Sequence, residues 1–147
     1  MTSSDLTFEQ LLEAPPAAVW LALLDHEGMS RWLPVKVTEV VRRVGGGRGT
    51  VRRIRVGPLA FDEEVVYADA PVGDRPGRLV YRIIRGVPVS FHRGEVLVAP
   101  AAGGRTTLTW NIRLGSPVPF LAWSIARGLR PSMERGLWTL ATIVDGV

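Results

Sequence analysis

A chain of 147 residues has the length of one domain, and we expect residues 1–147 to fold as a single unit. With 46% hydrophobic and 22% charged residues, the composition excludes a disordered or fibrous protein. The net charge of +4 rests on 17 arginines, since Lys36 is the only lysine. These arginines are scattered among apolar residues, whereas nucleic-acid binding needs basic and aromatic residues gathered on one face. We therefore expect no nucleic-acid partner.

The residue types that are missing exclude several kinds of site. The chain has no cysteine, which rules out disulfides, thiolate metal ligands and a cysteine nucleophile. Its two histidines, His26 and His92, lie far apart without acids at matching spacing, so we expect no metal and no cofactor. The N-terminus lacks the basic and apolar regions of a signal peptide, and no window approaches about 18 continuous apolar residues. We expect a cytoplasmic protein with no membrane span.

The N-terminal part of the chain predicts one strand followed by two short helical segments. Residues 6–13 read as the strand, which ends at Ala14-Pro15-Pro16. A helix over 16–25 is favoured because proline fits the first turn of a helix and apolar residues recur on one side. A short helical turn is expected over 26–34, and we expect His26 to be exposed there.

From residue 35 onward the pattern is that of strands separated by glycine and proline turns. The expected strands cover 35–44, 48–56, 59–69, 78–85, 88–98 and 105–115. Their short connections indicate an antiparallel meander. The last segment, 119–144, has helical periodicity, and Pro131 should kink or divide it. The whole pattern is α+β, and the long helix is the only element large enough to cover the apolar face of the sheet.

The order of these elements and several local motifs resemble the SRPBCC superfamily, also called START or Bet v 1-like, and within it the polyketide cyclase/dehydrase-like branch. The motifs are Ala14-Pro15-Pro16-Ala17-Ala18-Val19-Trp20 with Leu24-Asp25, Arg31-Trp32-Leu33-Pro34, Gly47-Arg48-Gly49-Thr50-Val51-Arg52, Gly103-Gly104-Arg105-Thr106-Thr107-Leu108-Thr109-Trp110, and the C-terminal helix. The likeness covers nearly the whole chain.

This resemblance implies the helix-grip fold, in which a curved seven-stranded antiparallel sheet wraps around a long C-terminal helix and two short helices join strands 1 and 2. It also implies a deep, mostly apolar cavity between the sheet and the helix. In this superfamily such cavities take up lipids, polyketides and other hydrophobic molecules. No single reaction is implied, because the superfamily includes cyclases, carriers, receptors and co-chaperone modules.

Strand alternation then predicts which polar residues face that cavity. A two-residue turn at Gly57-Pro58 would pair Val56 with Leu59, Ile54 with Phe61, and Arg52 with Glu63. Since the first two pairs are apolar, this face should be the inner one, with Arg52 and Glu63 on the cavity wall. The opposite face should place Arg53, Arg55, Asp62 and Glu64 in solvent.

The same reasoning applies to the next hairpin. With Gly86-Val87 as its turn, Ile83 pairs with Ser90, Tyr81 with His92 and Leu79 with Gly94. His92 then faces inward beside Tyr81. If Val96 pairs with Leu108 on the last strand, Gly94 lies opposite Trp110 and leaves room for the indole or for a ligand.

Four of these residues are candidates for catalysis: His92, Tyr81, Glu63 and Arg52. Arg52 or Tyr81 would stabilise an enolate oxygen while His92 or Glu63 moves protons. The alternatives are a buried structural ion pair for Arg52 and Glu63 and a hydrogen-bonded structural histidine for His92. Candidates for contact with the ligand are Trp32, Phe61, Ile83, Ser90, Trp110, Met133 and Leu137. For all of these except Ile83 and Ser90, the alternative is a place in the core.

The leading hypothesis is a protein that binds a hydrophobic small molecule, polyketide-like, aromatic or lipid, and catalyses its cyclisation or dehydration. The second is a non-catalytic carrier or sensor of a hydrophobic metabolite, and the third is an interaction module like the co-chaperones. Trp123 and Trp138 lie either on the inner side of the helix or at a surface through which two copies form a homodimer.

Overall fold

The computed structural model of the chain describes residues 2–33, 35–87 and 91–145. The elements follow the predicted order of one strand, two short helices, six strands and one long helix. They are β1 (Thr2–Leu12), α1 (Pro16–Leu24), the 3₁₀ helix η1 (Glu27–Arg31), β2 (Lys36–Arg42), β3 (Val51–Val56), β4 (Leu59–Asp69), β5 (Gly77–Arg85), β6 (Phe91–Ala101), the 3₁₀ turn η2 (Ala102–Gly104), β7 (Arg105–Ser116) and α2 (Leu121–Val144). Of the expected strand 88–98, residues 88–90 lie outside the described part.

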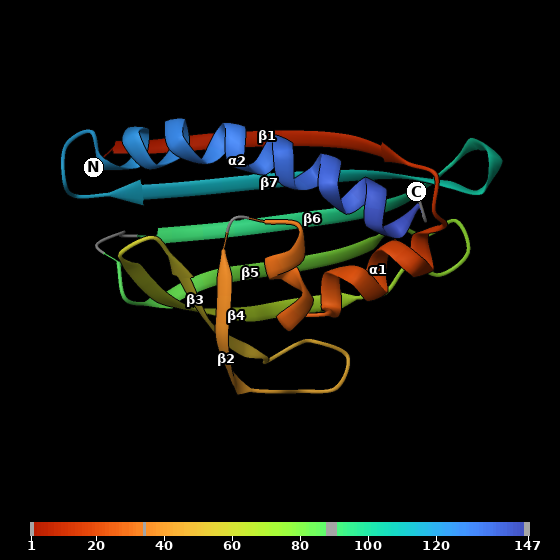
Figure 1. The fold of residues 1–147 in the computed structure, drawn as a ribbon, viewed down its shortest axis with the longest axis horizontal. Helices are drawn as coiled ribbons and strands as arrows, with labels where there is room; N and C mark the ends of the chain where they lie inside the picture. Colours follow the sequence, from red (N-terminus) through yellow and green to blue (C-terminus); the bar gives the residue numbers. More distant parts are fainter. Residues whose placement is uncertain (1, 34, 88–90, 146–147) are drawn as a thin grey trace.

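The strands form one antiparallel sheet in the order β1-β7-β6-β5-β4-β3-β2. β2 to β7 are a meander, and β1 pairs with β7 along its whole length, from Thr2 opposite Ser116 to Leu12 opposite Thr106. This pairing brings polar residues 2–5 into the strand, although no hydrophobic alternation indicated it. Figure 1 shows α2 lying across one face of the sheet, with α1 and η1 on the same side. The α+β helix-grip fold is confirmed.

Register shifts curve the sheet around this face. Two interrupt the pairing of β2 with β3, and two interrupt the pairing of β4 with β5. A bulged strand bends and twists more strongly than a regular one. Accordingly, β2 and β3 curl forward in Figure 1 and give the sheet a concave face.

The helix α2 packs against the sheet through one apolar side. Met133, Leu137 and Leu140 are buried, and they belong to one core cluster with residues of α1 and the sheet. Pro131 lies inside α2 without ending it, so of the two predicted effects, a kink or a division, the division does not occur. Apolar packing on both sides of the proline, at Ala126 and Met133, compensates for the one helical hydrogen bond that it removes. Within the described residues, no helix is long and apolar enough to cross a membrane.

The predicted register of the first hairpin is confirmed. Val56 pairs with Leu59, Ile54 with Phe61 and Arg52 with Glu63. The two-residue turn leaves little freedom, because a slip of one position would turn every apolar residue of β3 outward.

The next two pairings are shifted by two residues from the prediction. Tyr81 lies opposite Gly94 rather than His92, and Val96 lies opposite Trp110 rather than Leu108. A shift of two residues keeps each side chain on its predicted face. The β6–β7 hairpin closes around the three-residue turn η2, in which Gly103 and Gly104 have φ angles of 78° and 76°.

The role of Gly94 also differs from the prediction. It accommodates the ring of Tyr81, not the indole of Trp110, because a Cβ at this position would overlap the phenol ring. Glycine is therefore required where the Tyr81 side chain crosses β6.

We predict that Gly94→Ala lowers the free energy of unfolding by at least about 1–3 kcal/mol, because the new methyl group must displace the Tyr81 ring. Gly45→Ala is the matched control, since a Cβ at Gly45 meets no atom within 4 Å. Urea unfolding of the two variants and the parent chain makes the comparison. Equal stability of both variants would contradict the placement of Tyr81 over Gly94.

Candidate functional site

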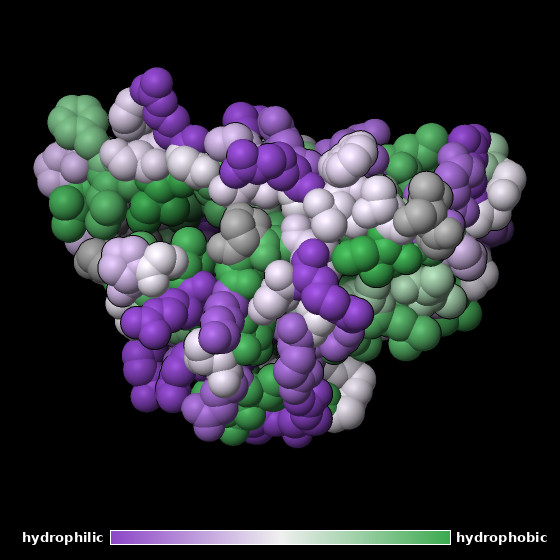
Figure 2. Space-filling view, viewed as in Figure 1, coloured by the Kyte–Doolittle hydropathy of each residue, from purple (hydrophilic) through white to green (hydrophobic). Residues whose placement is uncertain are grey.

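A cavity of about 420 Å³ lies between the concave face of the sheet and α2. Its size is that of pockets that hold small organic molecules. Figure 2 shows the surface hollowed below α2, with hydrophobic side chains around the hollow. The apolar part of the lining consists of Met29, Leu33, Val35, Ile54, Val56, Leu59, Phe61, Ile83, Val87, Trp110, Ile112, Leu114, Ile125, Leu129 and Met133.

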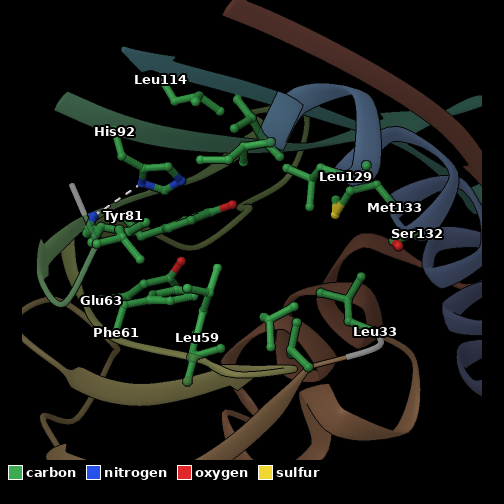
Figure 3. Close-up of a pocket in the computed structure, with 18 of the residues that line it drawn as sticks. Leu33, Leu59, Phe61, Glu63, Tyr81, His92, Leu114, Leu129, Ser132 and Met133 are labelled. Atoms are coloured by element: carbon green, nitrogen blue, oxygen red, sulfur yellow. Dashed lines mark hydrogen bonds between the residues drawn. The ribbon is translucent and has the colours of Figure 1, made fainter. Parts of the chain in front are cut away.

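The charged and titratable part of the lining is a cluster that the sheet supplies. It consists of Arg52 on β3, Glu63 on β4, Tyr81 on β5 and His92 on β6. In Figure 3 Glu63, Tyr81 and His92 extend from the sheet on one side of the cavity, while Leu129 and Met133 approach from α2. Four residues that the sequence singled out on different strands thus line one cavity. We call them the polar cluster.

Arg52 and Glu63 form a buried ion pair. Arg52 is 1% exposed, and its Nε and Nη2 lie 3.2 and 3.1 Å from Oε1 of Glu63. Nε donates a hydrogen bond to this oxygen and Nη2 completes the ion pair with it, while none of the described residues donates to Oε2. Because Glu63 lines the cavity, Oε2 is the oxygen that can meet a ligand. The guanidinium also lies over the ring of Tyr81, 5.4 Å from its centroid.

His26 supports this pair from behind the cavity wall. It was predicted to be exposed, but only 4% of it is accessible, and its Nδ1 lies 3.4 Å from Nη1 of Arg52. Burial first, and then the positive charges of Arg52 and Arg43, lower the pKa of His26 to about 4. The ring is therefore neutral near pH 7 and accepts a hydrogen bond from the guanidinium. Sequence alternation could not reveal this contact, because His26 lies outside the strands.

Tyr81 is held by aromatic neighbours on both sides. Nε1 of Trp110 donates a hydrogen bond of 2.8 Å to its hydroxyl, and the two rings meet nearly perpendicularly. The His92 ring lies 5.5 Å away, centroid to centroid. Burial and the nearby Glu63 carboxylate raise the pKa of Tyr81 above its usual range. The phenol thus keeps its proton and acts as a hydrogen-bond donor, not as a base.

His92 is fixed in one tautomer by the backbone. The N–H of Ile83 donates to its Nδ1 at 3.2 Å, so in the neutral ring the proton sits on Nε2, on the cavity side (Figure 3). Burial lowers the pKa of His92, which keeps the ring neutral. In this state Nε2–H can donate to an oxygen atom but cannot accept a proton.

The residues predicted to touch the ligand divide into three groups. Phe61, Ile83, Trp110 and Met133 line the cavity. Trp32 and Leu137 are buried in the core behind the lining, where Trp32 packs edge-on against Trp110 with centroids 5.8 Å apart. Ser90 lies outside the described residues.

Several lining residues had no place among the predicted site residues. Met29 and Leu33 come from the segment around η1, and Ser124, Ile125, Leu129 and Ser132 come from the first half of α2. Ile125 and Leu129 lie four residues apart, a spacing that places both on one side of a helix. For Met29 and Leu33 no periodic signal exists, because the segment is too short for one.

One prediction about the surface needs correction, and one of two alternatives is excluded. Asp62 faces away from the cavity, as expected, but it is 3% exposed because Arg53 and Arg85 lie over it as ion-pair partners. Trp123 and Trp138 are exposed, so they do not lie on the inner side of the helix.

Comparison with known proteins agrees with this fold. The family model described as polyketide cyclase / dehydrase and lipid transport matches residues 4–145. No curated protein matches the chain.

Solved structures extend the likeness over the whole chain. A START superfamily protein from Mycobacterium smegmatis is similar at a TM-score of 0.75 and 15% identity, with 97% of each chain covered. Ara h 8.0201 has a TM-score of 0.72 and 15% identity over 99% of this chain and 100% of its own. The protein XoxI from Bacillus cereus has a TM-score of 0.69 and 17% identity over 96% of this chain and 95% of its own. Identities this low carry the fold alone, and they confirm the resemblance to the SRPBCC, START and Bet v 1-like proteins.

We predict that the protein loses stability on acidification below about pH 6.5. The pKa of His26 is about 4 in the folded chain and about 6.5 in the unfolded chain, so the unfolded state takes up the proton first as the pH falls. This histidine alone lowers the free energy of unfolding by up to about 1.4 kcal/mol per pH unit. His26→Gln should show a shallower loss between about pH 7 and pH 5, measured by urea unfolding, with His92 providing the remainder. An unchanged slope would contradict the burial of a neutral His26.

We also predict that Arg52→Met destabilises the fold by roughly 3–5 kcal/mol, because it leaves the Glu63 carboxylate buried without a partner. The double variant Arg52→Met/Glu63→Leu should regain most of this loss, since no charge then remains. Arg113→Met, which breaks an exposed pair with Asp5, is the control and should cost at most about 1 kcal/mol. A double variant as unstable as the single one would show that the pair is not the source of the loss.

Proposed function

The chain belongs to the polyketide cyclase / dehydrase and lipid transport family, and on this premise we propose that it binds a neutral, carbonyl-bearing hydrophobic molecule in its cavity and promotes its cyclisation or dehydration. A polyketide-like or aromatic compound has this chemistry. The observation that carries the proposal is a single cluster of charged and titratable groups in a cavity whose lining is otherwise apolar except for Ser124 and Ser132.

The hydrogen-bonding state of the cluster supports a neutral oxygen as the group that it binds. Arg52 directs one N–H group at Glu63 and one at His26, and its Nη2 lies 3.1 Å from Glu63, so N–H groups remain available to a ligand. Tyr81 and His92 each have one further proton to donate. The positive charge of Arg52 is already balanced by Glu63, so a ligand carboxylate would add an unbalanced charge in an apolar interior.

Glu63 is the group suited to move protons. In the proposed reaction its Oε2 removes a proton from the carbon between two carbonyl groups, and the resulting enolate oxygen accepts hydrogen bonds from Arg52 and His92. The enolate carbon then attacks the carbon of a further carbonyl group, farther along the same substrate molecule. Protonated Glu63 returns the proton to the new alkoxide, which completes the ring with no net change in protons.

Dehydration would follow by the same residues. Glu63 removes a second proton from the carbon next to the new hydroxyl group, and the hydroxyl leaves with that proton as water while a carbon–carbon double bond forms. No oxidant or further reactant takes part. Folding of the extended substrate in the apolar cavity would bring its two reacting carbons together.

A carrier without turnover is the second candidate function. Its support is that Arg52 and Glu63 satisfy each other and that neutral His92 cannot accept a proton at Nε2. In that case the polar cluster would only orient the ligand.

Binding is tested by native mass spectrometry of the purified chain and titration with the ligand found. We predict that Leu129→Trp weakens binding by at least about tenfold, because the larger ring enters the cavity. Ile143→Trp is the control on the same helix, since Ile143 is exposed and does not line the cavity. Equal affinity of the two variants would refute a ligand site beside Leu129.

Turnover is tested with Glu63→Gln on the same ligand. We expect its rate to fall by about 10²–10⁴-fold, the usual contribution of a positioned base, while binding changes less. Loss of binding and rate in equal measure, or no turnover by the parent chain, would leave the carrier function and refute the catalytic one.

A further inference from the structure

The face of α2 that points away from the sheet combines aromatic and basic side chains. Trp123 and Trp138 are 54% and 68% exposed, and Phe120, which directly precedes the helix, is 74% exposed. At 3.6 residues per turn, positions 123, 127, 130, 134 and 138 fall within an arc of about 80°. We call these five residues, with Phe120 and Arg135 at the edge, the outer face of α2.

The arginines of this face lack the acidic partners that most other arginines of the described residues have. On the sheet, Arg82 pairs with Glu64 and Arg113 with Asp5. By contrast, within residues 2–33, 35–87 and 91–145, Arg127, Arg130 and Arg135 form no ion pair. Arg127 instead lies 5.1 Å from the ring centroid of Trp123, and Arg130 lies 5.6 Å from that of Phe8 at the edge of the sheet on β1. Glu134 is the only acid in α2, so the outer face is positive.

Exposed indoles beside unpaired arginines indicate one kind of partner. Tryptophan has an apolar ring and a polar N–H, and it is enriched where membranes meet water, at the level of the lipid headgroups. Helices that lie in that interface carry both arginine and tryptophan, and anionic lipids attract the arginines. An acidic protein would match the charges, but it would give no reason for two exposed indoles about 22 Å apart along the helix.

We propose that the outer face of α2 docks on an anionic lipid bilayer. In this arrangement Arg127, Arg130 and Arg135 reach the lipid phosphates, and Trp123 and Trp138 insert their rings among the headgroups. The first half of the same helix lines the cavity through Ser124, Ile125 and Gly128. When the chain is bound, this wall of the cavity therefore lies next to the bilayer, in which hydrophobic molecules dissolve. Figure 2 shows hydrophobic side chains gathered at the end of the molecule where α2 begins, beside the hollow.

The test is co-sedimentation of the full chain with vesicles. We expect binding to vesicles of phosphatidylcholine and phosphatidylglycerol in equal parts, weaker binding at high salt, and little binding to phosphatidylcholine alone. Absence of binding to the mixed vesicles, or equal binding to both kinds, would overturn the proposal.

Matched variants then separate the outer face from the net charge. The triple variant Arg127→Gln/Arg130→Gln/Arg135→Gln should bind the mixed vesicles on the order of 100-fold more weakly. The control Arg42→Gln/Arg48→Gln/Arg55→Gln removes the same three charges from exposed arginines, which form no ion pairs within the described residues, and should bind nearly as the parent does. Equal losses in the two variants would overturn the proposal.

A second pair of variants tests the aromatic residues. Trp123→Ala/Trp138→Ala should also bind mixed vesicles more weakly, whereas Leu21→Ala, at a 69% exposed position on α1, should not. If the tryptophan variant binds vesicles normally and the parent binds polyglutamate as tightly, an acidic protein is the partner instead. If the parent is a dimer in solution and this variant is a monomer, the partner is a second copy. None of the substituted residues lines the cavity, so ligand binding is tested independently.

Discussion

A guanidinium group with almost no solvent contact needs a counter-charge and hydrogen-bond acceptors, and the centre of this molecule is built around that need. Arg52 finds a carboxylate on β4, an imidazole just before η1 and an aromatic face on β5. These partners come from three separate parts of the chain. The register of β3 with β4, the position of η1 and the orientation of Tyr81 are therefore coupled through one side chain.

The same network restricts what the cavity can accept. Its two charges cancel, the imidazole rings of His26 and His92 are kept neutral by depressed pKa values, and Tyr81 keeps its proton because its pKa is raised. The groups that remain free to act on a ligand are the neutral donors Tyr81 and His92, the remaining N–H groups of Arg52, whose charge Glu63 balances, and one carboxylate oxygen of Glu63. Such a site favours a carbonyl group over an anion, and this is the physical basis on which a carbonyl-bearing ligand is proposed.

How much of this could be inferred from the sequence depended on local constraints. At Arg52 and Glu63 a two-residue turn and clear alternation left one register, and both residues line the cavity as predicted. At Tyr81 the longer connection between β5 and β6 left the register open by two positions, and the steric demand of the ring over Gly94 decides it. Alternation predicts the face of the sheet on which a side chain lies, but not how deeply that side chain is buried. Asp62 was therefore assigned to the correct face, but its burial under Arg53 and Arg85 was not predicted. Burial of His26 depends on a contact with a residue far along the chain, for which no local pattern exists.

The lining of the cavity is divided between two structural layers. The charged and titratable groups stand on β3 to β6, while α2 contributes Ile125, Leu129 and Met133 among its apolar contacts. Substitutions in the helix can therefore change the volume and shape of the cavity without disturbing the hydrogen bonds of the polar cluster. In evolutionary terms, substitutions in α2 can change which apolar part of a ligand fits the cavity, while the polar cluster that contacts its oxygen atom stays the same. A chain built in this way is a practical starting point for redesigned specificity.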